Sequence, residues 1–171
     1  MNASQALPEP WLRGTITEVG AVPRAVLHAL ELANEDLKKW CSSLTEAEFN
    51  ARPHGLPSVA FQLRHIARSV DRLLTYAEGN ALSAEQLTAL KTESESVPPA
   101  QSVFDELPSS LTRGAQRIRA LAKSDLEQTR FVGKKALPTT LGGLLVHVAD
   151  HTQRHVGQAI TTAKILLAER R

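Results

Sequence analysis

The sequence has few of the residues that mark secreted, membrane or disulfide-bonded proteins. It contains one cysteine, Cys41, which excludes an internal disulfide and fits a reducing compartment. No apolar run is long enough to span a membrane, and residues 1–10 show no secretory signal. Aromatic residues make up only 4%, whereas leucine and alanine are abundant, which favours helix over strand. We therefore expect a cytoplasmic protein, built mainly from helices, that does not contact a membrane.

The net charge of the chain is small. At +2 it is too low to indicate binding to nucleic acid, and no basic run is interleaved with aromatic residues. The 171 residues are 42% hydrophobic and 22% charged, as in an ordinary globular protein. We expect a single domain over residues 1–171. Residues 1–20 lack a helical period and are expected to form a leader in which Trp11 and Leu12 dock on the body.

Four segments carry apolar residues at the spacing of an amphipathic helix. They lie at roughly residues 22–43, 58–78, 103–124 and 139–167. Thr45 and Ser83 each begin a capping box, which predicts two short helices in the connections, the second extending towards Glu95. No segment alternates well enough to indicate a strand. The pattern predicts an all-α fold, an antiparallel four-helix bundle with short extra helices in its connections.

Proline and glycine divide these segments. The run at residues 97–99 contains two prolines and breaks the chain before the third long helix. Pro108 is expected to kink that helix or split it in two. Residues 131–138, with Gly133 and Pro138, are expected to form a loop. Thr139 or Thr140 then caps the last helix.

The last helix carries three histidines in successive turns. His147, His151 and His155 follow one another at steps of four, which places them within about 80° on one helix face. This face lies along the apolar stripe or at its margin. Each imidazole has two nitrogens that need partners when buried, and charged rings would repel one another. A divalent cation held by neutral rings would satisfy both requirements, whereas the alternative is a set of core histidines with ordinary hydrogen bonds.

Two protease motifs are incomplete in this helix. His151 and His155 have the spacing of a zinc-protease helix, but Thr152 stands where that motif needs its glutamate base. The inverted motif would require glutamate at Asp150, whose shorter side chain also lies off the histidine face. A metalloprotease is therefore not favoured.

Residues 147–158 resemble the last helix of the DinB-like family of damage-inducible proteins, the DinB/YfiT-like metalloenzyme family. In that family this helix carries a His-x-x-x-His pair followed by x-Gly-Gln. Here the pair corresponds to His151 and His155, and the following residues to Gly157 and Gln158. The family is unrelated to the DNA polymerase that shares its name.

A second segment carries the same resemblance. Residues 58–67 are similar to the family's second helix, where His65 stands at the position of the third metal ligand. The resemblance implies a four-helix bundle with a three-histidine site for a divalent metal, most often zinc or nickel. It also implies a homodimer, and some relatives are transferases or isomerases that use the metal to activate a low-molecular-weight thiol. We therefore expect a thiol S-transferase acting on a small electrophile; a hydrolase and a non-catalytic metal-binding stress-response module are the alternatives.

Three further residues are candidates for the surroundings of the metal. Gln158 lies on the histidine face and is expected to hydrogen-bond a ligand or substrate, or else to pack as a helix amide. His147 and Tyr76 are the candidate acid or base groups of the cavity. Gly157 is expected to allow a close approach between helices, and His28 is expected to be structural or exposed.

Overall fold

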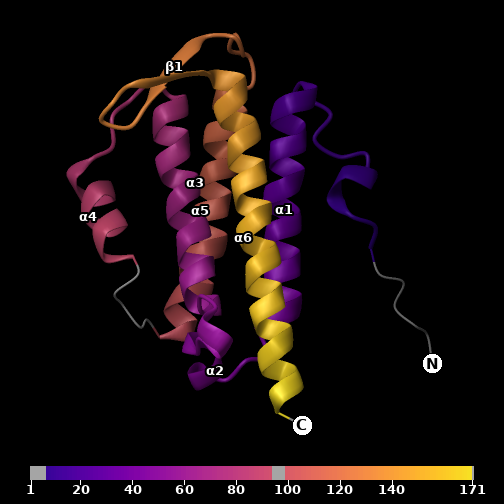
Figure 1. Ribbon diagram of the computed structural model, residues 1–171. Helices are drawn as coiled ribbons and strands as arrows, with labels where there is room; N and C mark the ends of the chain where they lie inside the picture. Colours follow the sequence, from indigo (N-terminus) through magenta and orange to yellow (C-terminus); the bar gives the residue numbers. More distant parts are fainter. Residues whose placement is uncertain (1–6, 94–98, 171) are drawn as a thin grey trace.

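Four long helices pack side by side in the computed structural model, which describes residues 7–93 and 99–170 (Figure 1). They are α1 (Ala21–Cys41), α3 (Val59–Ala77), α5 (Ala100–Leu121) and α6 (Leu141–Glu169). Around the bundle, α1 packs against α6, α6 against α3, α3 against α5 and α5 against α1. The predicted four-helix bundle is confirmed. No helix in the described ranges has the length and hydropathy to cross a membrane.

The helices do not simply alternate in direction. The short helix α2 (Glu46–Asn50) marks the end of the bundle at which α1 ends and α3 begins. At this same end, Glu46 accepts a hydrogen bond from the first residue of α5, and Glu48 pairs with Arg170 after α6. Hence α3 and α5 run parallel, as do α1 and α6. Among the four pairs of packed neighbours, the expected antiparallel arrangement therefore describes α3–α6 and α1–α5, whereas α3–α5 and α1–α6 are parallel.

The connection between α3 and α5 makes this arrangement possible. It contains the short helix α4 (Ala84–Thr92), which lies outside α3 (Figure 1). Its capping box at Ser83 and that of α2 at Thr45 are both present, as predicted. The expected extension to Glu95 and the break at residues 97–99 fall partly on residues 94–98, which lie outside the described residues.

A β-hairpin joins α5 to α6, where the sequence predicted a loop. Strands β1 (Thr129–Val132) and β2 (Leu137–Thr140) pair antiparallel, with Thr129 opposite Thr140. Each strand has only four residues, too few to show a period, and Pro138 argued against a strand. Thr140 caps α6 by accepting a hydrogen bond from the Gly143 amide.

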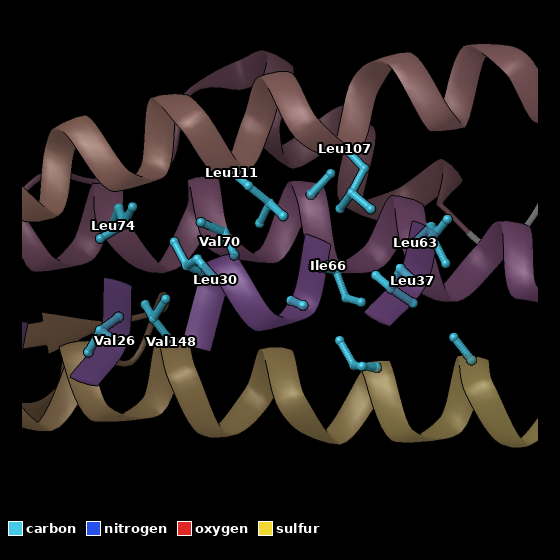
Figure 2. Close-up of a cluster of buried hydrophobic side chains, with 14 of the residues drawn as sticks. Val26, Leu30, Leu37, Leu63, Ile66, Val70, Leu74, Leu107, Leu111 and Val148 are labelled. Carbon is cyan, nitrogen blue, oxygen red and sulfur yellow. The ribbon is translucent and has the colours of Figure 1, made fainter. Parts of the chain in front are cut away.

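The core runs through the centre of the bundle. Figure 2 shows apolar side chains from the four long helices pointing toward one another, including Leu37, Leu63, Ile66 and Val148. Cys41 belongs to this core, and burial raises the pKa of its thiol to about 12, so it behaves as a small hydrophobic residue. His28 is also buried, with its Nε2 atom 3.3 Å from the Thr15 hydroxyl.

The structure corrects one expectation about local packing and narrows another. Trp11 and Leu12 remain 62% and 56% exposed, and their segment attaches through buried Pro10 and a pair of hydrogen bonds from Arg13 to Glu35. Residues 1–6 of the expected leader lie outside the described residues. Helix α5 is not split at Pro108, which lies on its exposed side, where water can replace the hydrogen bond that proline cannot donate.

Candidate metal centre

Three histidines from two helices meet where α3 packs against α6. His65 comes from α3, and His151 and His155 come from successive turns of α6. One ring nitrogen from each lies within 4.8 Å of the other two. The ring centroids are 4.3–5.1 Å apart, and all three side chains are only partly buried. This spacing allows a single ion to contact all three rings.

Helix packing fixes this geometry. Ile66 is completely buried in the core, so its neighbour His65 lies about 100° around α3, at the edge of the packed face. On α6, Thr152 and Val156 are buried directly after His151 and His155. The histidines therefore occupy the margin of the α3–α6 interface, where one side of each ring is packed and the other can be reached by a small molecule.

Two hydrogen bonds determine which ring nitrogens face the centre. The Nδ1 atom of His65 lies 2.9 Å from a carboxylate oxygen of Glu93, and the Nδ1 atom of His155 lies 2.6 Å from the side-chain carbonyl oxygen of Gln62. Both partners are acceptors, so each Nδ1 carries a proton and donates it. The Nε2 atoms then present lone pairs, and that of His65 is 3.4 Å from Nε2 of His151.

Glu93 is held in place by hydrogen bonds from two residues. It is only 5% exposed and accepts hydrogen bonds from Arg72 as well as from His65. Burial acts to raise the pKa of Glu93, but the His65 hydrogen bond and the Arg72 charge outweigh it and hold the pKa below its ordinary value. An ionised carboxylate that orients a histidine from behind is a common partner of metal-ligating imidazole.

The electrostatics of the cluster favour neutral rings. Burial, followed by the neighbouring cationic groups, lowers the pKa of both His151 and His155 to about 4. At neutral pH these rings therefore carry no charge, and their lone pairs remain free to bind a cation. A centre lined by three imidazole nitrogens, two with Nδ1 protonated by the acceptors behind them, fits a divalent transition metal.

One nitrogen in the cluster is not satisfied. Nδ1 of His151 is buried and has no hydrogen-bond partner among the described residues. This ring is therefore the least firmly oriented of the three. The His65 ring has a different neighbour: the Phe61 ring stacks on it with centroids 5.5 Å apart and covers one of its faces.

The structure separates the other predicted site residues. The His147 ring lies 5.4 Å from that of His151, but it is exposed and does not belong to the group of three. Gln158 reaches the cluster indirectly, because its side-chain oxygen accepts a hydrogen bond from Gln62, which in turn holds His155. Tyr76 lies about three turns beyond His65 and lines a different hollow, beside Phe131 of the hairpin.

Sequence reasoning missed the residues behind the histidines. Gln62 lies three positions before His65, so helix spacing alone could have placed it on the same face. Glu93 had no such signal, because its position depends on how the segment after α4 packs on α3. Arg72 could not be identified for the same reason.

These observations define a class of protein, a helical bundle with a three-histidine cluster set between two of its long helices. The family model of the DinB superfamily matches residues 29–159, a range that includes all three histidines. The chain therefore belongs to the DinB superfamily, as the sequence resemblance indicated. No curated protein matches it.

A solved structure shares the fold. The chain is similar to YfiT from Bacillus subtilis, with a TM-score of 0.63 and 15% sequence identity over 84% of this chain and 87% of that one. YfiT is described as a probable metal-dependent hydrolase with an unusual four-helix bundle topology. At this level of identity the likeness shows the fold alone.

Proposed function

We propose that this protein binds one divalent transition-metal ion, zinc or nickel, through Nε2 of His65, His151 and His155, and that it is a metal-dependent enzyme. The observation that supports the proposal is the pair of hydrogen bonds from Nδ1 of His65 and His155 to Glu93 and Gln62. They orient two lone pairs toward a third imidazole. An ion held by three neutral ligands keeps its full charge and lowers the pKa of a bound thiol or water.

The substrate of first choice is a low-molecular-weight thiol, transferred to a small electrophile. Three protein ligands leave an open position on the ion, and the partly exposed cluster can admit a small molecule. Hydrolysis is the second candidate, supported by the likeness to the fold of YfiT, which carries that description. Both reactions need the same three ligands.

The protein's own residues would orient and cover the site. Glu93 and Gln62 fix the tautomers of two ligands, and Phe61 covers one face of His65. A group that moves protons is also needed. Of the two acid or base groups expected from the sequence, only His147 lies near the cluster, so we assign proton transfer to its ring.

Elemental analysis of purified variants tests the metal site. The wild type should hold about one equivalent of zinc or nickel, and His65→Ala and His151→Ala should each lose it. His147→Ala is the matched control, one turn from His151, and should keep the metal. Metal retained in His65→Ala, or lost equally in the control, would show that the ion is held elsewhere.

Turnover assays then separate the two reactions. The metal-loaded protein is incubated with an electrophilic chloronitrobenzene and each of several cellular thiols, and separately with an activated ester. Thiol consumption that disappears in His155→Ala supports the transferase, whereas ester cleavage alone supports the hydrolase. In the favoured reaction His147→Gln should lower kcat by about a hundredfold while the metal content is unchanged. A fully loaded protein without either activity would instead be a non-catalytic metal-binding module.

A further inference from the structure

Gly157 occupies a costly position in α6 without any packing reason. Glycine inside a helix costs about 1 kcal/mol relative to alanine. At Gly114 in α5 the reason is visible, because an added Cβ would lie 2.8 Å from a side-chain carbon of Val70. At Gly157 an added Cβ would meet no atom of the described residues within 4 Å. The expectation that Gly157 allows close helix approach is therefore wrong: the missing side chain leaves open space.

That space belongs to a cavity of about 490 Å³ between α6 and the segment that leads into α3. Leu56, Pro57 and Gly157 form an apolar wall, and Arg154, Gln158 and Thr161 supply polar groups. An apolar pocket of several hundred cubic ångströms with a few convergent polar groups is typical of a small-molecule site.

The cavity adjoins the histidine cluster through one chain of hydrogen bonds. Gln158 lines the cavity and accepts a hydrogen bond of 2.9 Å from Gln62. The other end of the Gln62 amide accepts the 2.6 Å hydrogen bond from His155. A molecule in the cavity would therefore lie against the residues that orient one of the proposed metal ligands.

The polar side of the cavity carries one guanidinium group, that of Arg154. Arg154 is half exposed, and the hydrogen bond to Asp150 occupies its Nη2 atom while its guanidinium carries five N–H donors. None of the described residues that line the cavity is acidic. The combination of an apolar wall and one guanidinium suits a molecule with an apolar body and one anionic group.

We propose that this cavity binds small organic anions with an apolar body, that Gly157 keeps it open, and that it is the substrate pocket of the metal centre. The last part rests on the proposed function. Binding in the cavity itself does not require the metal, so the two proposals can fail separately.

Fluorescence titration with anilinonaphthalene sulfonate, which has an aromatic body and one sulfonate, tests the pocket. We expect saturable binding to the wild type and at least a tenfold weaker affinity in Gly157→Leu, whose side chain fills the cavity. Thr112→Leu is the control: it places a leucine in a separate hollow between α1 and α5 and should leave the affinity unchanged. No saturable binding, or equal affinity in Gly157→Leu, would overturn the proposal.

A second pair of measurements tests the anionic preference. Arg154→Gln should weaken the sulfonate probe about threefold to tenfold, while the uncharged analogue N-phenylnaphthylamine should bind both proteins equally. Equal losses for the two probes would overturn the assignment to Arg154. Gly157→Ala should raise the melting temperature, since its methyl group meets open space, whereas a lower melting temperature would show that the glycine is needed for packing.

The metal content of the same variants separates this proposal from the proposed function. Gly157→Leu should keep its metal, and His151→Ala should keep its affinity for the sulfonate probe. If Gly157→Leu loses probe binding and no protein holds metal, the pocket proposal stands and the proposed metal centre is wrong. If Gly157→Leu binds the probe like the wild type and metal contents are as expected, the metal centre stands and the pocket proposal is wrong.

Discussion

Helix α3 carries two kinds of buried side chain, apolar ones and polar ones, and burial affects their free energy differently. One side places Leu63, Ile66 and Val70 in the apolar core, where removal from water stabilises the fold. The adjoining stripe carries Gln62, which is completely buried, and His65, which is partly buried, and their polar atoms need specific partners. The first arrangement stabilises the protein without any ligand, whereas the second costs free energy that a bound cation would offset. Core substitutions should therefore change stability, and cluster substitutions should change binding.

The largest effect is expected from a cavity in the core. Leu37 is completely buried, and Leu37→Ala should lower the free energy of unfolding by about 2 to 5 kcal/mol. Urea denaturation measures this loss, while elemental analysis of the folded fraction should show unchanged metal. Metal lost in proportion to stability would mean that core and cluster are not separate.

Metal removal should have the next largest effect. With free metal at about a thousand times its Kd, binding adds about 4 kcal/mol to the stability of the folded state. A strong chelator should therefore lower the melting temperature of the wild type. The melting temperature of His151→Ala should not respond to the chelator, and an equal response in both proteins would contradict a role for this cluster.

The carboxylate behind His65 should tune the affinity without being needed for the fold. Glu93→Gln keeps an oxygen that can accept from Nδ1 but removes the charge, so the Kd for metal should rise about tenfold to a hundredfold. Competition with a chelating dye measures this change. Glu106→Gln is the control, because Glu106 of α5 pairs with Arg68, which lies on α3 like His65. Equal Kd values for the two variants would rule out the proposed effect.

The last prediction concerns the pH dependence of the metal-free protein. The pKa of His151 and His155 is lowered to about 4, below the ordinary value of 6.5, so the unfolded chain binds more protons between these values. Stability should be fully present above pH 6.5 and fall toward pH 4, by on the order of 1 kcal/mol per pH unit for each of the two histidines. Urea midpoints of the chelated wild type should show a steeper fall than those of His151→Gln. Equal slopes would mean that His151 is not desolvated.

The sequence predicted the bundle because helical spacing is a local property. Apolar residues at steps of three and four mark the four long helices, and the capping residues Thr45 and Ser83 mark two short ones. The four-residue strands of the hairpin were not predictable, because they are too short for a period and are paired only by the geometry of their turn. Helix direction also escaped prediction, since it depends on the path of the α3–α5 connection.

The candidate site was predictable to the extent that its residues lie on regular helices. His151 and His155 share a helix face by spacing alone, but His65 was assigned from the resemblance to a family and not from its surroundings. Tyr76 was misplaced because a shared helix face says nothing about distance along the axis. Glu93 was missed because its contact with His65 joins segments that no local pattern relates.

Because α3 and α5 run parallel, a connection passes outside α3, and this connection supplies one residue of the site, Glu93. A chain that simply reversed at each helix end would have no connection passing outside α3, and therefore no segment to deliver Glu93 to His65. The ion-binding rings belong to the bundle, but the carboxylate that adjusts them belongs to this outer connection. Evolution or design could thus alter metal preference by replacing one peripheral segment, with the packing of the four long helices left as it is.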